Sequence, residues 1–297
     1  MDRMSRKMFY NDLFRKYGLI FAILISIFGL ALMILISLVF ELIGSAFDCN
    51  ENIVFYFVTS GLCRLIAFII LIIIADKYCL CGRLGLGFKN IGESFKSALF
   101  GYAIAFGFLI DSLSMNLFLK NELCIDVMLW TLFVCITVGL FEETLIRGLA
   151  MNILKIKFWR VGKWFYILLQ ALIFMGLHSV NFILGDMTLT QVKTQFVVTF
   201  LMGIYYGWVY EKTHSLFGVA ILHGFYDFCV STSGSFMPTG ESGFVYADVG
   251  VTLLIYTVLF YFLFLSIRKL VRSINMYRTF NENLNWNMAR VSVPFSC

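Results

Sequence analysis

Residues 18–40 read GLIFAILISIFGLALMILISLVF, an apolar run that contains no charged side chain. A helix that crosses the hydrocarbon core of a bilayer needs about 20 such residues. The run is too long for the core of a signal peptide and has no small-residue cleavage site, so we expect a retained membrane anchor. No strand-like alternation competes with it, and lipid offers the backbone no hydrogen-bond partners, so the run predicts a transmembrane helix.

Similar apolar stretches continue along the chain. Seven of them follow the first: 53–75, 97–118, 127–150, 164–184, 194–210, 215–231 and 244–267. Only 14% of the 297 residues are charged, whereas about 25% are charged in soluble domains. The sequence therefore predicts an all-α fold, a polytopic bundle of about eight transmembrane helices. Because no internal repeat or Pro/Ser-rich linker is visible, we expect one integral membrane domain over residues 1–297, in contact with membrane lipid.

The distribution of Lys and Arg indicates how the predicted helices are oriented. Of the 23 Lys and Arg residues, 19 fall on one side of the membrane and two on the other. Cytoplasmic segments carry the excess of Lys and Arg in membrane proteins. We therefore expect a multi-pass protein of the cell membrane with both termini in the cytoplasm. The excess of Lys and Arg in cytoplasmic segments accounts for the formal net charge of +5. No nucleic-acid partner is therefore expected.

Charged side chains inside the predicted spans are candidates for function, because burying them in lipid costs several kcal/mol. The fourth run contains FEETLIR, in which Glu143 and Arg147 lie on one helix face and can form a structural ion pair. Glu142 points about 100° away from Glu143 and has no local partner, which suits general acid–base chemistry. The alternative is a cluster of snorkelling charges at a helix end. Two more charged residues, Arg64 and Asp111, lie in the second and third runs. We interpret them as a structural ion pair or as side chains that snorkel to the membrane surface.

Two of the three histidines also lie in predicted spans. The fifth run contains FMGLHSVN with His178, and the seventh contains HGFYD with His223 and Asp227 on one helix face. At about 1.5 Å per residue, both histidines fall at depths compatible with that of Glu142. A lone buried histidine is usually structural, but two histidines near several carboxylates favour a shared site. We place this catalytic core in residues 126–231.

The order of these three motifs resembles that of a known family of membrane-embedded proteases. The motifs are EETLIR at 142–147, FMGLH at 174–178 and HGFYD at 223–227. The family includes type II CAAX prenyl endopeptidases and bacteriocin-processing or self-immunity proteins, and is called the CPBP or Abi family. The resemblance covers about residues 142–227.

The resemblance implies a role for each motif. Glu142 would be the catalytic glutamate, and His178 would help it to hold the attacking water. His223 would stabilise the oxyanion together with the fourth residue of its motif, which is often Asn in the family but is Asp227 here. An amide can donate a hydrogen bond to an oxyanion, whereas an aspartate donates only when it is protonated. Otherwise Asp227 would orient His223 or help to bind a metal ion.

Metal dependence stays open at this point. The side chains that would form a credible zinc site with an open position for water are Glu142, His178, His223 and Asp227. The motif H-E-x-x-H is absent, however. Members of the family are described both as metalloproteases and as metal-independent glutamate proteases, and we favour the second description.

The resemblance implies an intramembrane endopeptidase that hydrolyses a peptide bond with a water activated by glutamate and histidine. Its substrate would be a peptide or protein at the membrane, either a prenylated protein or a bacteriocin or leader peptide. The alternative is a non-catalytic protein that binds membrane peptides or confers self-immunity to a bacteriocin. An ion-coupled transporter is disfavoured, because the sequence shows no repeat and neither proline lies in a predicted span.

Overall fold

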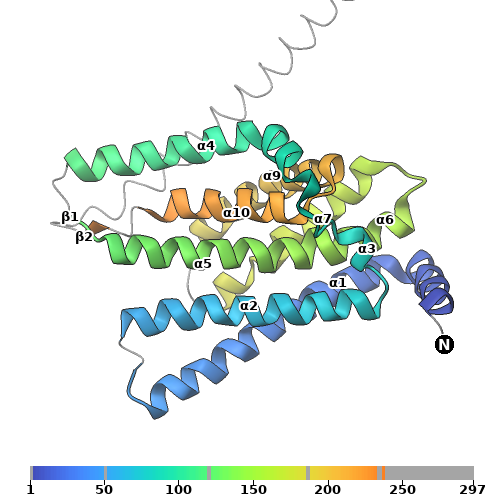
Figure 1. Ribbon diagram of the computed structural model, residues 1–297, viewed down its shortest axis with the longest axis horizontal. Helices are drawn as coiled ribbons and strands as arrows, with labels where there is room; N and C mark the ends of the chain where they lie inside the picture. Colours follow the sequence, from blue (N-terminus) through green and yellow to red (C-terminus); the bar gives the residue numbers. More distant parts are fainter. Residues whose placement is uncertain (1–2, 50–51, 119–121, 185–187, 233–235, 238–297) are drawn as a thin grey trace, which may run out of the picture. The chain divides into compact units, whose positions relative to one another are not determined.

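The computed structural model describes residues 3–49, 52–118, 122–184, 188–232 and 236–237, which belong to one compact unit, Met1–Ser242 (Figure 1). The longer helices are α1 (Arg3–Ala46), α2 (Ile53–Lys77), α4 (Ile91–Phe118), α5 (Ile125–Glu143), α7 (Lys163–Leu177), α9 (Leu189–Thr213) and α10 (Leu216–Ser231). The shorter ones are α3 (Cys81–Leu84), the 3-10 helix η1 (Phe88–Asn90), the π-helix η2 (Thr144–Met151), α6 (Asn152–Phe158) and α8 (Val180–Ile183). The prediction of an all-α membrane bundle is confirmed.

A single short strand pair accompanies the helices in the described residues. Strand β1 (Glu122–Leu123) pairs antiparallel with β2 (Phe236–Met237), so that Glu122 lies opposite Met237. The pair joins the segment before α5 to the segment after α10, at the same end of these two helices (Figure 1).

Seven of the eight predicted runs coincide with helices. Five helical segments are long and apolar enough to cross a membrane: Met4–Ala46, Ile53–Lys77, Ile91–Ser114, Ile125–Phe158 and Lys163–Ile183. The other two runs correspond to α9 and to the 16-residue α10, which do not meet both conditions. The eighth run, 244–267, lies outside the described residues. The number of spans and the single domain over 1–297 therefore stay predictions.

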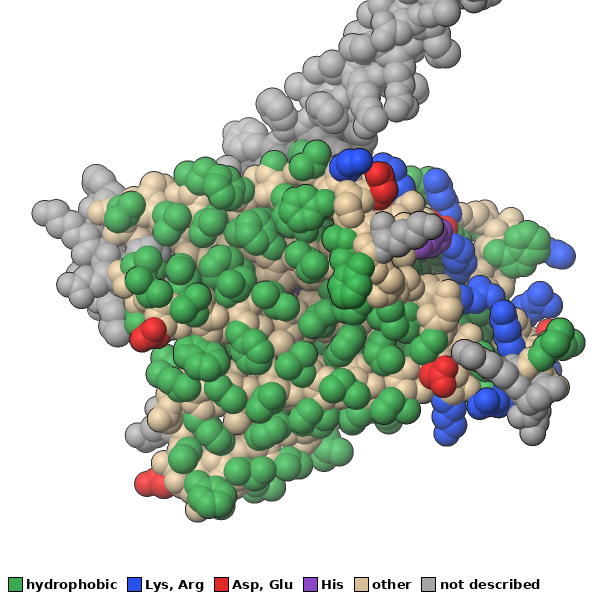
Figure 2. All heavy atoms as spheres, in the orientation of Figure 1, with side chains coloured by type: hydrophobic (Ala, Val, Ile, Leu, Met, Phe, Trp, Pro, Cys, Tyr) green, Lys and Arg blue, Asp and Glu red, His purple; other side chains and the backbone are tan. Residues whose placement is uncertain are grey.

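Apolar side chains cover the sides of the helices, and Lys and Arg side chains gather at one end, near α3 and α6 (Figure 2). The exposed side chains include Ile27, Leu35 and Ile73, which are 54%, 61% and 63% exposed. Apolar surface on this scale marks a membrane or a protein interface in general. It is the surface expected of a membrane protein, and the basic end agrees with the distribution from which the orientation is predicted.

Two glycines let α5 and α10 approach each other at backbone distance. A Cβ atom at Gly139 of α5 would collide with the carbonyl of Ala220, and one at Gly224 of α10 would lie 2.7 Å from the carbonyl oxygen of Cys135. Small residues at such contacts allow helices in a membrane to pack closely. Helix α10 also packs against α4. The glycine contact therefore places the HGFYD motif of α10 beside the end of α5, where EETLIR begins.

This contact gives a first testable prediction. Gly139→Leu is expected to destabilise the protein by more than about 3 kcal/mol, because overpacking already costs about 1–3 kcal/mol and the backbone of α10 cannot rotate away. Gly107→Leu in α4 is the matched control, since a Cβ there meets nothing within 4 Å. Thermal unfolding of both variants in detergent measures the difference. Equal unfolding temperatures would show that the close approach is not needed.

Candidate active site

The two glutamates lie where an α-helix widens into a π-helix. Glu142 and Glu143 are the last residues of α5, and Arg147 lies in η2. The side-chain amide of Asn152 donates to the carbonyl oxygens of Arg147 and Gly148, at 3.1 and 2.9 Å. These two carbonyl oxygens of the π-helix thus receive hydrogen bonds from a side chain. π-Helical turns are rare and occur frequently at functional sites.

Glu143 and Arg147 form an ion pair that is closed off from the surface. Nη1 of Arg147 lies 2.8 Å from Oε1 of Glu143, and both side chains are fully buried. The guanidinium lies 4.6 Å from the ring centre of Phe174 and 5.5 Å from that of Tyr206. Its Nη2 donates to the carbonyl oxygen of Gly203 at 3.4 Å. The contact that the i,i+4 spacing predicts is therefore present, with aromatic rings around the charge.

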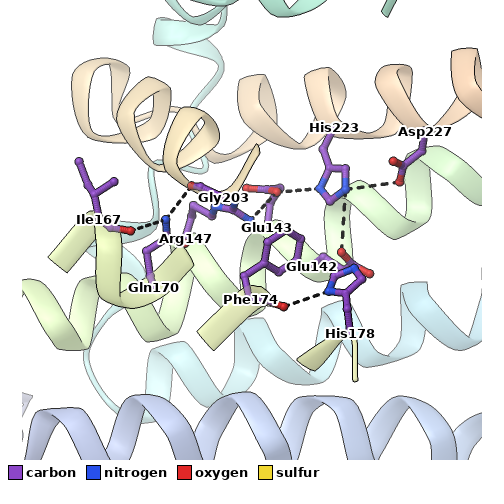
Figure 3. Close-up of polar contacts among 10 residues, drawn as sticks. All are labelled: Glu142, Glu143, Arg147, Ile167, Gln170, Phe174, His178, Gly203, His223 and Asp227. Carbon is purple, nitrogen blue, oxygen red and sulfur yellow. Dashed lines mark hydrogen bonds and ion pairs between the residues drawn. The ribbon is translucent and has the colours of Figure 1, made fainter. Parts of the chain in front are cut away.

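Glu143 has a second partner that the sequence did not indicate. Nδ1 of His223 lies 2.7 Å from Oε1 of Glu143, the same oxygen that binds Arg147 (Figure 3). The two residues are 80 positions apart, so no helical spacing relates them. Glu143 therefore does more than neutralise Arg147, because it also fixes the orientation of the His223 ring.

The other ring nitrogen of His223 faces two further carboxylates (Figure 3). Nε2 lies 3.4 Å from Oδ2 of Asp227 and 3.9 Å from Oε2 of Glu142. An imidazole donates from both nitrogens only when it is doubly protonated. The side chains of Glu142 and Asp227 are 27% and 30% exposed, whereas that of Glu143 is fully buried. One carboxylate thus anchors the ring from within the bundle, and the other two are partly exposed.

His178 lies at a break in the fifth predicted run. The run 164–184 was expected to be one helix, but α7 ends before His178 and α8 begins after Ser179. Nδ1 of His178 donates to the carbonyl of Phe174 at 2.9 Å, and Oγ of Ser179 donates to that of Gly176 at 2.7 Å. Side chains that bind nearby carbonyls in this way compete with helical hydrogen bonds. Because a carbonyl only accepts, Nδ1 carries the proton and Nε2 is left as an acceptor.

Glu142 and His178 line one cavity of about 300 Å³. Most of its wall is apolar and comes from α1, α5, η2 and α7, and its other polar lining residues are Arg64, Asn181 and Gln195. His223 and Asp227 do not line this cavity. Glu142 therefore stands between the cavity and the His223 ring, and the structure brings all four predicted catalytic side chains into one region of the bundle.

The four side chains do not converge as metal ligands. In the part of the chain that the structure describes, no group of three His, Cys, Asp or Glu residues is arranged to hold a metal ion. Nδ1 of His178 is engaged by a backbone carbonyl and Nδ1 of His223 by Glu143, so only the Nε2 atoms are left as possible ligands. In the described residues, this arrangement does not fit the zinc set considered from the sequence.

Comparison with known proteins identifies the segment that carries these motifs. Residues 125–229 match the family model described as Rce1-like, the type II CAAX prenyl endopeptidase Rce1-like family. No curated protein and no solved structure matched the chain. The matched residues run from the start of α5 into α10 and include Glu142, His178 and His223. Residues 125–229 are therefore similar to the Rce1-like type II CAAX prenyl endopeptidases, which supports the resemblance to the CPBP family found in the motifs.

Proposed function

We propose that this protein is an intramembrane endopeptidase of the glutamate type, with Glu142 as the general base. The observation that carries this proposal is the unequal environment of the two adjacent glutamates. Glu143 is fully buried and is engaged by Arg147 and His223. Glu142 is partly exposed and lines a cavity together with His178. Only Glu142 is free to meet a water molecule and a substrate.

The proposed reaction uses each side chain where it lies. A water molecule binds between Glu142 and Nε2 of His178 and attacks the carbonyl carbon of the scissile bond as Glu142 takes its proton. His223, donating from Nε2, stabilises the negative charge on the carbonyl oxygen together with a protonated Asp227. Glu142 then passes the proton to the leaving nitrogen, and the C–N bond breaks. Glu143 takes no part in proton transfer but positions the His223 ring.

A prenylated peptide is the substrate that the surroundings of the cavity favour. A second cavity of about 570 Å³ lies between α1 and α7, and apolar side chains make up most of its wall. We call this cavity the apolar groove. It shares Leu30, Leu177 and Val180 with the cavity of Glu142. An isoprenoid chain in the apolar groove would leave the adjoining peptide in reach of Glu142. The same apolar groove also suits an apolar bacteriocin or leader peptide. A non-catalytic protein that binds such peptides or confers immunity would need a groove of this kind as well.

We infer from the Lys and Arg distribution that the protein lies in the cell membrane with both termini cytoplasmic. The basic side chains gather at the end where η2 continues into α6 (Figure 2). This orientation puts Glu142, at the middle of the continuous helical segment Ile125–Phe158, near the middle or inner half of the bilayer. Peptides made in the cytoplasm would therefore reach the site from the basic end.

Peptide release by the purified protein tests this function. Wild-type protein in nanodiscs is incubated with an S-farnesylated CAAX peptide or with an apolar leader peptide, with and without a chelator, and products are identified by mass spectrometry. We expect a defined cleavage product that survives the chelator and is absent from a Glu142→Ala control. Binding of either peptide without cleavage would favour the non-catalytic alternative. Activity lost to the chelator and restored by zinc would contradict the glutamate type.

Asp227 provides a finer prediction for the same assay. Asp227→Asn is expected to lower kcat by no more than about tenfold, because the amide can donate a hydrogen bond to the oxyanion as a protonated aspartate does, and its oxygen can still accept one. Asp227→Ala removes both capacities and is expected to cost about 10²–10³ in rate. An Asn variant as inactive as the Ala variant would show that the negative charge itself is required.

A further inference from the structure

Arg64 of α2 is an intramembrane charge that the proposed reaction does not use. At 1.5 Å per residue, Arg64 lies about 16 Å along the helix from its first residue, Ile53. It lies outside residues 125–229, the part of the chain that matches the family model. Ionisable side chains inside membrane spans are functional candidates in general, because they are costly to place there. Arg64 therefore needs a physical reason for its position.

The guanidinium has no carboxylate partner among the described residues. Its hydrogen bonds go from Nη1 to the backbone oxygen and to Oγ of Ser60, at 2.7 and 2.6 Å, within its own helix. The pairing with Asp111 that the sequence left open is not formed in the described structure. Glu41 shares a cavity with Arg64 but does not lie within ion-pair distance of it. Donor groups of Arg64 thus stay available in a region of low dielectric constant.

Arg64 lies where two cavities meet. It lines the cavity of about 300 Å³ that holds Glu142 and His178, and also a neighbouring cavity of about 450 Å³ between α1 and α2. The apolar groove between α1 and α7 joins the cavity of Glu142 through other residues, Leu30 among them. The cavity of Glu142 therefore has an apolar groove at one border and a guanidinium at another.

We propose that Arg64 binds a carboxylate of the substrate peptide, on the side of the scissile bond away from the apolar groove. Guanidinium groups bind carboxylates through two parallel hydrogen bonds, and such charge-assisted bonds are the strong ones in a site sheltered from water. The carboxylate comes from the C-terminus of the peptide or from an acidic side chain near it. This assignment rests on the proposed function, because it takes the cavity of Glu142 to be the peptide site.

Binding without turnover tests the assignment separately from catalysis. The protein is Glu142→Gln in nanodiscs, and the probes are fluorescent S-farnesylated CAAX peptides in three forms. One has a free C-terminal carboxylate, one has a C-terminal amide, and one has the amide with Asp as its last residue. We expect Arg64→Gln to weaken binding of the free acid by about 10- to 100-fold and to leave binding of the plain amide unchanged. Arg64→Lys is expected to restore part of the affinity.

The third probe and a control variant complete the design. If the Asp-containing amide depends on Arg64 as the free acid does, a side-chain carboxylate can serve as well as the C-terminus. Lys77→Gln, which removes a positive charge from the exposed end of the same helix, is expected to change nothing. Equal effects of Arg64→Gln on acid and plain amide, or no binding of any probe, would overturn the assignment. Arg64-dependent binding by a wild-type protein that releases no product would contradict the protease proposal alone.

Discussion

Glu142→Gln is expected to lower the rate of peptide release by about 10²–10⁴-fold, the range that a general acid–base group supplies, while the protein still folds. Gln has nearly the same shape as Glu, but its amide cannot take a proton from water. The Glu142 side chain is partly exposed, and its Oε2 lies 3.9 Å from Nε2 of His223. The substitution therefore leaves the buried contacts of Glu143 intact.

Single-turnover cleavage and thermal unfolding of the same preparations separate the loss of chemistry from the loss of folding. The matched control is Glu93→Gln in α4, where the carboxylate is 67% exposed and pairs with Lys96 on the surface. It is expected to behave as wild type in both measurements. A Glu142→Gln protein that keeps its activity, beside a folded but inactive Glu143→Gln protein, would reverse the roles assigned to the two glutamates.

Helical periodicity predicted the contacts that lie within one helix. The Glu143–Arg147 pair and the proximity of His223 to Asp227 both follow from i,i+4 spacing, because 3.6 residues per turn puts such side chains on one face. These contacts measure 2.8 and 3.4 Å. The apolar runs likewise located most of the helices, because lipid leaves the backbone no alternative to internal hydrogen bonds.

Contacts between different helices could not be predicted from the spacing of residues in the sequence. The bond from His223 to Glu143 depends on how α5 and α10 are rotated about their axes, and that rotation is set by the close approach at Gly139 and Gly224. No spacing within a single chain segment encodes it. The sequence placed both residues in one region but gave Glu143 only one of its two partners.

The interruption at His178 and the place of Arg64 were missed for related reasons. The fifth run is apolar on both sides of His178, so hydropathy gives one continuous span, whereas the histidine ring binds a carbonyl of its own helix. Arg64 has no charged partner at helical spacing. It stands out only because it lines two cavities, which the folded structure reveals. Cavities arise from the packing of several helices and leave no periodic signal.

Glu143→Gln is expected to destabilise the folded protein by about 3–5 kcal/mol, the cost of removing one partner of a buried ion pair. The variant leaves the guanidinium of Arg147 buried without a counter-charge, although its position between two aromatic rings is unchanged. It also gives His223 a neutral partner in place of a carboxylate at Nδ1. Thermal and denaturant unfolding in detergent measure the loss.

The control is an ion pair of similar length whose two side chains are partly exposed to solvent. Lys155 and Glu211 are 2.7 Å apart, with side chains 30% and 17% exposed, so Glu211→Gln is expected to cost about 1 kcal/mol or less. Equal losses in the two variants would contradict the special cost of the buried pair.

The double variant Glu143→Gln/Arg147→Met separates the two duties of Glu143. Removing both charges abolishes the uncompensated guanidinium, so much of the lost stability is expected to return, as it does when buried ion pairs are replaced by apolar groups. Activity is expected to stay low, because the ring of His223 still lacks the carboxylate that orients it 2.7 Å away. A double variant that regains both stability and activity would show that Glu143 serves Arg147 alone, whereas stability without activity would assign the positioning of His223 to Glu143.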